Sequence, residues 1–251
     1  MRNIISAIVC SVIVCGCGSA SAPAGPGAAA AGKSFSYDAP QAPTADEAAA
    51  AAGVQSAFSA NPSDAAAAVV ALLQKLSTDA SGFALPAPVG NLPALSSAAC
   101  VTTNGNTFTF NNCSVTEGAV TVTVNGSLTA SQAGASWDVT ADVQGARAAA
   151  TYSIATHDVG NFTGSEGHVS GQAGSDISGT VAVNGQTVST FALATSVALD
   201  LGYQLTPPCV TSGTLEAKLV WTQRPAGVTV ADKGVKIAWT GCGAFQVSHS
   251  R

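Results

Sequence analysis

Hydrophobic and polar residues alternate along most of the chain after Cys100, and a period of two is typical of half-buried β-strands. The alternation is clear at Phe108–Phe110 and at Val120–Val124. Asn125-Gly126 and Asn184-Gly185 each follow such a run, and Asn-Gly in this position favours a tight hairpin turn. The pattern predicts a mainly β fold, an antiparallel meander of about 8–10 strands that forms an open sheet, a sandwich or a half-barrel.

The longest alternating run is FALATSVALDLGYQL, residues 191–205. One phase of this run is large and apolar, whereas the other is small and carries a single charge. At about 3.3 Å per residue the run would span roughly 50 Å, so we expect a bend or bulge near Gly202. The large phase is a candidate ligand-facing surface and includes Phe191, Leu193, Val197, Leu199 and Leu201.

Ahead of the strands, the sequence predicts two helices over residues 44–78. Thr44-Ala45-Asp46-Glu47 is a capping box, and Asn61-Pro62 ends the first helix and starts the second. The second helix carries an apolar stripe that needs a partner surface: Val69, Val70, Leu72, Leu73 and Leu76. We expect both helices to pack on the sheet, with residues 79–99 as the connector and residues 100–251 as the β domain.

The N-terminus has the pattern of an export signal. A charged start is followed by an apolar run from Ile4 to Val14, which predicts a signal peptide over residues 1–16. The sequence Val14-Cys15-Gly16-Cys17 resembles the lipobox of bacterial lipoproteins, and this resemblance implies a diacylglyceryl thioether on Cys17 that anchors the protein in the membrane. The alternative is an ordinary cleaved signal, with cleavage near Ala20 or Ala22. The residue after Cys17 is not acidic, which by the same resemblance favours the outer membrane of the cell envelope.

Residues 17–43 are rich in Gly, Ala, Ser and Pro, which predicts a flexible tether between the anchor and the folded part. Removal of the signal takes away Arg2, so 8 Lys and Arg remain against 14 Asp and Glu, a net charge of −6. Nucleic-acid binding needs a positive patch, and the scattered basic residues form none in the sequence. We therefore expect no nucleic-acid partner.

Four cysteines follow Cys17, and an even number in an exported protein predicts two disulfides. Of the three possible connectivities we choose Cys100–Cys113 and Cys209–Cys242, because each pair brackets a local β segment and closes the shorter loop. Zinc binding does not fit, since there is no Cys-x-x-Cys pair and no histidine nearby in the sequence.

His157-Asp158 and Glu166-Gly167-His168 flank residues 159–165. If these residues form a hairpin loop centred near Phe162, the two histidines face each other beside the two carboxylates, as in a metal site. The alternative is a polar, solvated loop. No Gly-x-Ser-x-Gly nucleophile motif occurs, so the sequence offers no catalytic residue and implies no cofactor.

Three functions fit these patterns. The first is a non-catalytic exported lipoprotein whose β domain is structural or binds a macromolecule. The second is a carrier of a hydrophobic ligand such as a lipid, in which a half-barrel is covered by the helices. In architecture this would resemble the bacterial lipoprotein carriers, although no motif matches. The third is a metal-dependent enzyme that uses the loop between His157 and His168.

Overall fold

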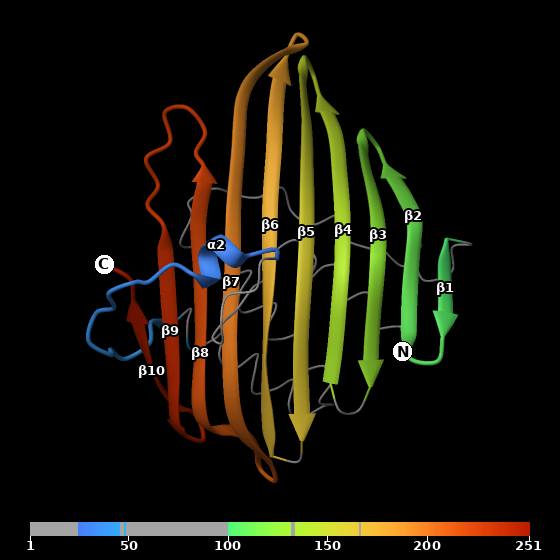
Figure 1. The fold of residues 1–251 in the computed structure, drawn as a ribbon. Coiled ribbons are helices and arrows are strands. Elements are labelled where there is room, and N and C mark those ends of the chain that lie inside the picture. The colour runs from blue at the N-terminus through green and yellow to red at the C-terminus, as the bar shows by residue number, and fades with distance from the viewer. Residues whose placement is uncertain (1–24, 46–47, 49–99, 132–133, 166) are drawn as a thin grey trace.

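The computed structural model describes residues 25–45, 48, 100–131, 134–165 and 167–251. In these residues a single open antiparallel sheet contains ten strands in sequence order, each paired with its chain neighbours (Figure 1). The predicted antiparallel meander is confirmed, as an open sheet. The strands are β1 (Val101–Asn104), β2 (Thr107–Glu117), β3 (Val120–Ser131), β4 (Gly134–Arg147), β5 (Ala150–Ser165), β6 (His168–Val183), β7 (Gln186–Leu205), β8 (Pro208–Gln223), β9 (Lys233–Gly241) and β10 (Ala244–His249).

The two predicted helices are not borne out. The described residues contain one short helix, α2 (Ala28–Ala31), and it lies ahead of the predicted pair. At the predicted capping box, the Ala48 N–H donates a 2.9 Å hydrogen bond to the Thr44 carbonyl, which is α-helical spacing. The remainder of residues 44–78 lies outside the described residues, as do the connector 79–99, the signal 1–16 and Cys17.

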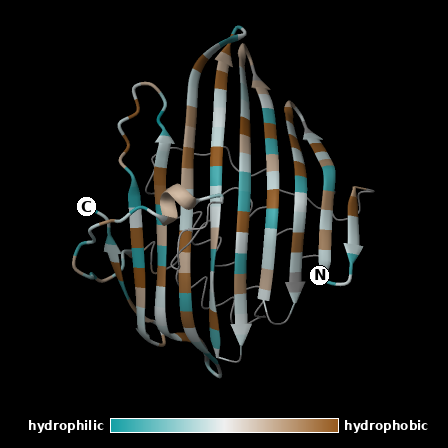
Figure 2. Cartoon of the chain, viewed as in Figure 1, coloured by the Kyte–Doolittle hydropathy of each residue, from teal (hydrophilic) through white to brown (hydrophobic). Residues whose placement is uncertain are grey.

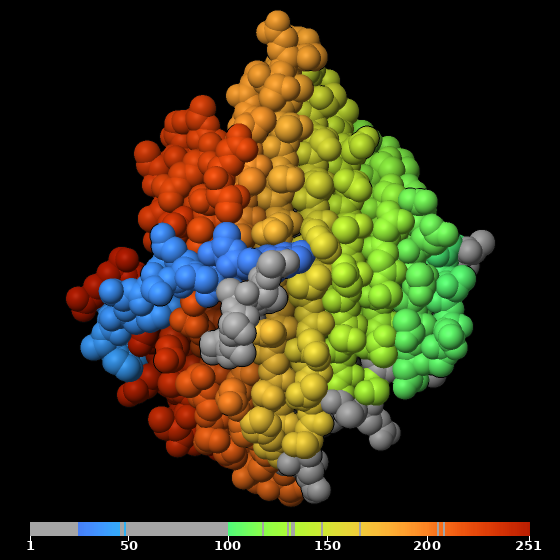
Figure 3. All heavy atoms as spheres, viewed as in Figure 1, coloured from blue at the N-terminus to red at the C-terminus, as the bar shows by residue number. Residues whose placement is uncertain are grey.

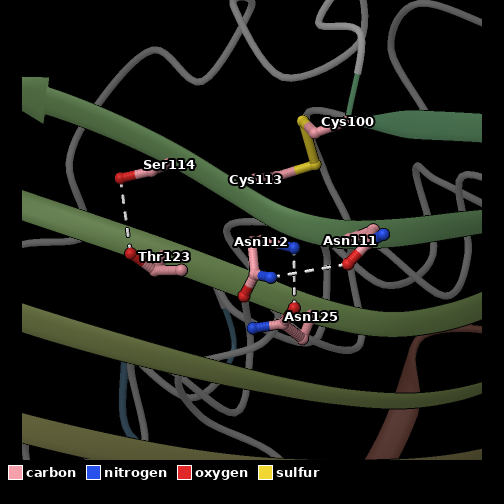
Figure 4. The surroundings of a disulfide bond; sticks show 7 residues. All are labelled: Cys100, Asn111, Asn112, Cys113, Ser114, Thr123 and Asn125. Carbon is pink, nitrogen blue, oxygen red and sulfur yellow. Dashed lines mark hydrogen bonds between the residues drawn. A yellow bond between two sulfur atoms is a disulfide. The ribbon is translucent and has the colours of Figure 1, made fainter.

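The two Asn-Gly pairs have different roles. Asn184-Gly185 joins β6 to β7 with φ values of 51° and 78°, so this predicted hairpin is confirmed. The turn predicted at Asn125-Gly126 is wrong, because both residues lie inside β3. They face a bulge in β2, where Asn112 has a φ of 51° and its N–H donates a 2.7 Å hydrogen bond to Asn125 Oδ1 (Figure 4). Asn125 thus satisfies a backbone donor that the bulge removes from the strand pairing.

Both predicted disulfides are present. Cys100–Cys113 ties the start of β1 to β2 immediately after the bulge (Figure 4), and its Cα atoms are 5.2 Å apart. Cys209–Cys242 joins the beginning of β8 to the turn after β9, with 5.3 Å between the Cα atoms. The bulge expected near Gly202 is also confirmed, as a register shift between Gly202 and Tyr203.

One face of the sheet, here called the apolar face, carries most of the large hydrophobic side chains. Hydropathy alternates along the strands, as Figure 2 shows. Leu201, Leu215 and Ile237 on this face are fully buried. Fully burying a side chain of this size stabilises the fold by about 1.5–3 kcal/mol, so the face is the main source of stability.

The opposite face is partly covered by residues 25–43, which we call the strap. Figures 1 and 3 show the strap passing over β7 and β8 toward β10. Ala30 of α2 is fully buried against Ala194 and Val220. Farther on, Tyr37 and Gln41 form β-bridges with Ser250 and Val247, which covers the outer edge of the C-terminal strand.

Polar contacts also hold the strap. Lys33 Nζ lies 3.2 Å from an Asp232 carboxyl oxygen, and the Tyr37 hydroxyl donates a 2.7 Å hydrogen bond to Glu216. This packing differs from the flexible tether expected over 17–43. The physical reason is the small phase of β7, whose Ala and Ser side chains let another segment of backbone approach closely.

Gly27 makes the closest of these approaches. It has a φ of 77°, and a Cβ on it would lie 2.5 Å from both the Gly174 Cα and the Thr195 carbonyl oxygen. We expect Gly27→Ala to detach the strap, because the backbone atoms of the sheet cannot move aside for the added methyl group. The sheet itself should stay folded. Hydrogen exchange should show faster exchange in residues 25–43 and unchanged protection in β3–β5. Gly25→Ala is the matched control, since nothing lies within 4 Å of its added Cβ; equal effects of the two variants would contradict this account.

Candidate functional site

Three polar side chains lie buried in the middle of the apolar face. Asp158 on β5 pairs directly with Ser175 on β6, which pairs directly with Thr195 on β7. Their exposed fractions are 2%, 0% and 6%. Directly paired side chains on one face lie about 5 Å apart, so the three form a continuous polar row, here called the seam.

The seam divides the apolar core. On β7, Leu193 belongs to one hydrophobic cluster and Val197 to another, with Thr195 between them. The first cluster continues over β2–β5, and the second occupies the β8–β10 end of the sheet. A ligand on this face would therefore meet apolar side chains on both sides of a polar centre.

The polar atoms of the seam have no hydrogen-bond partner in the described part of the chain. This applies to both carboxyl oxygens of Asp158, to Ser175 Oγ and to Thr195 Oγ1. The neighbouring Thr156 hydroxyl, in contrast, donates a 3.5 Å hydrogen bond to the Ala141 carbonyl. Each buried polar group without a partner costs about 1–3 kcal/mol, so the seam destabilises the fold as it stands.

Burial also changes the protonation of the seam. Loss of water around the carboxyl group raises the pKa of Asp158 to about 8, and the negative charge of Asp176 acts in the same direction. The nearby hydroxyls of Ser175 and Thr156 lower this pKa and offset part of the increase. At neutral pH Asp158 is therefore mostly an uncharged carboxylic acid that can both donate and accept a hydrogen bond.

The structure separates the residues of the predicted metal site. β5 runs on through Phe162 to Ser165, which pairs with His168, so the predicted loop is wrong and the two histidines lie about 26 Å apart along the strands. His157 contacts Asp138 at 2.9 Å and His168 contacts Asp200 at 2.7 Å.

The two carboxyl groups of the predicted metal site do not form one site with the histidines either. Asp158 points to the apolar face while both histidines point to the other, and Glu166 is outside the described residues. No group of three possible metal ligands occurs in the described residues. The period-two alternation continues through Gly160 and Gly164, which lie within β5.

The five candidate ligand-facing residues of β7 do share the apolar face, and all are buried: Phe191, Leu193, Val197, Leu199 and Leu201. The seam, whose Thr195 lies between Leu193 and Val197, was not predicted. Strand phase could have found it, because Tyr152 and Ile154 share a face with positions 156 and 158, and Thr195 lies on the phase of Leu193. The sequence pattern instead indicated Asp158 as a metal-ligand candidate beside a hairpin loop.

Comparison with known proteins finds no matching family model, no matching curated protein and no matching solved structure. Among the described residues, none of the helices is long and apolar enough to cross a membrane.

The raised pKa of Asp158 makes the stability of the protein depend on pH. Between about pH 4 and pH 8 the folded state keeps a proton that the unfolded state has lost, so the free energy of unfolding should fall as pH rises. Asp158→Asn removes this ionisation. We expect the variant to gain on the wild type by up to about 1.4 kcal/mol per pH unit across that range.

Urea unfolding of both proteins at pH 4.5, 6 and 8 measures this difference. Asp142→Asn, an exposed position on the opposite face, serves as the control and should track the wild type at every pH. A constant gap between Asp158→Asn and wild type would show that Asp158 ionises normally.

Proposed function

We propose that this protein is an exported, lipid-anchored, non-catalytic binding protein that holds a hydrophobic molecule on its apolar face. The observation that supports it best is the seam of unpartnered polar groups in the centre of this face. A purely structural sheet would be more stable with apolar side chains there, because buried polar groups are normally paired. A bound molecule with one polar group would supply the partners.

The proposed lipid anchor on Cys17 rests on the resemblance of Val14-Cys15-Gly16-Cys17 to a lipobox. Only eight Cα-to-Cα steps separate Cys17 from Gly25, where the strap begins, and a fully extended chain of that length reaches about 28 Å. The strap therefore limits the reach expected for the 17–43 tether. The strap-bearing polar face would lie toward the membrane, and the apolar face would point away from it.

A binding role is favoured over catalysis by the placement of polar groups. A hydroxyl nucleophile needs an adjacent base. His157 and His168 lie on the opposite face from the seam hydroxyls, where each contacts a carboxylate. Asp158 is itself mostly protonated at neutral pH, because burial raises its pKa to about 8.

A macromolecular partner is the second candidate. It is favoured by the opposite face over β2–β5, which carries exposed threonine, serine and aspartate side chains. Some of them are held in cross-strand pairs, such as Thr116 with Thr121 at 3.0 Å between the hydroxyl oxygens. Such a surface is regular and polar, and could bind a protein or a glycan of the envelope.

Native mass spectrometry with organic extraction tests the main proposal on the exported mature chain carrying Cys17→Ser. We expect a hydrophobic molecule bound at close to one per chain. Ala173→Phe adds a ring on the apolar face beside the seam and should reduce the bound fraction, whereas Ala155→Phe on the opposite face should not. An empty wild-type chain with both disulfides intact would overturn ligand binding and favour the macromolecular partner.

The anchor makes a separate prediction. In a bacterial host, the wild-type chain should incorporate a labelled fatty acid and fractionate with membranes, and Cys17→Ser should do neither. Cys15→Ser is the matched control, because it leaves the small residue Gly16 ahead of Cys17. Release of an unlabelled, soluble wild-type chain would instead show an ordinary cleaved signal.

A further inference from the structure

The seam has the composition of a site for a polar group that is not itself charged. Its three side chains are a carboxyl and two hydroxyls, and within the described residues Asp158 forms no ion pair. A hydroxyl group can both donate and accept, which matches what Ser175 and Thr195 offer. An ionised group would have to leave water for a site without a described counter-charge.

The position of the seam also specifies the rest of the ligand. Leu193 and Ile177 adjoin it in one hydrophobic cluster and Val197 in the other, so apolar surface extends along the strands from both sides of the polar centre. The seam itself crosses β5, β6 and β7, a width of about 10 Å. A head of a few hydroxyl groups fits this width, and its hydrocarbon chains fit the clusters.

The backbone behind the seam is held in place from the opposite face. Gly27 of the strap packs against Gly174, and its N–H donates a 3.2 Å hydrogen bond to Asp176, next to Ser175 in β6. The strap thus braces the strand positions that carry the polar row. A rigid arrangement of this kind lowers the entropic cost of binding.

We propose that Asp158, Ser175 and Thr195 bind the uncharged, hydroxyl-bearing head of a long-chain lipid. This inference rests on the proposed function, since it assigns the polar subsite of the same hydrophobic ligand. The protonated carboxyl of Asp158 donates to a head-group oxygen, and the two hydroxyls accept from or donate to the remaining head-group hydroxyls. The hydrocarbon chains lie along the apolar face.

The test compares two lipids that differ in the head alone. The mature chain with Cys17→Ser is first stripped of bound lipid and saturated with the uncharged dye N-phenyl-1-naphthylamine, whose fluorescence reports occupancy of an apolar site. Monolauroylglycerol, with two free hydroxyls, and methyl laurate, with none, then compete for the dye. We expect monolauroylglycerol to displace the dye at a concentration at least tenfold lower.

Substitutions assign this preference to the seam. Asp158→Leu combined with Ser175→Ala should reduce the tenfold ratio to within about twofold while dye binding is kept, because the apolar surface is retained. Asp158→Asn retains a donor and an acceptor and should keep most of the preference. Asp142→Leu on the opposite face is the matched control and should leave the ratio unchanged.

The outcomes separate the two proposals. Failure of the wild type to bind the dye or either lipid would contradict hydrophobic-ligand binding itself. Dye binding without a preference for monolauroylglycerol, or a preference that survives Asp158→Leu with Ser175→Ala, would overturn the seam as the head-group site and leave ligand binding intact. A stronger preference for dodecylamine than for monolauroylglycerol would also overturn it, since the head would then be a cation.

Discussion

The apolar side chains of a single-layer sheet cannot be buried by the sheet itself, and this constraint governs the rest of the molecule. Ten strands in sequence order give two faces and two edges. The strap covers part of one face and the β10 edge, and a short β1 tied by Cys100–Cys113 ends the sheet at the other edge. The large residues on the apolar face are buried as well.

The two faces of β7 carry side chains of different size, and this difference makes the arrangement possible. Its large phase supplies residues to both hydrophobic clusters, while its small phase admits α2, with Ala30 against Ala194. Close approach at Gly27 then brings the strap backbone to within contact of β6 and β7. The same strand therefore stabilises both faces, and it carries Thr195 of the seam.

The sequence predicted the features that depend on local patterns. Alternation predicted the meander, Asn184-Gly185 predicted a hairpin, and cysteine spacing predicted both disulfides, and the structure confirms all three. Errors arose where a turn-forming residue serves packing instead. Asn125-Gly126 faces a bulge, and Gly160 leaves room for the Trp137 ring, which would lie 2.2 Å from an added Cβ.

The remaining features depend on contacts between distant segments. Docking of the alanine-rich strap follows from the shape of a surface formed by three strands, which composition alone does not reveal. The seam depends on the register of β5, β6 and β7, because Asp158, Ser175 and Thr195 are far apart in sequence and become neighbours only through strand pairing. Strand phase indicates which face each occupies, but register alone places them in one row.

The seam also bears on the choice between a structural and a binding role. Replacement of three buried polar groups by apolar ones would join the two hydrophobic clusters and remove a cost of about 1–3 kcal/mol for each unpartnered group. Stability alone gives no reason for a carboxyl at this point, least of all one whose pKa is raised to about 8 by the burial that stabilises its neighbours. A bound molecule with one polar group and long apolar chains would supply hydrogen-bond partners to these residues. The residues would then select the ligand instead of only destabilising the fold. The position of the seam, braced from behind by the strap and flanked by apolar side chains on both sides, is therefore the observation that favours the proposed ligand.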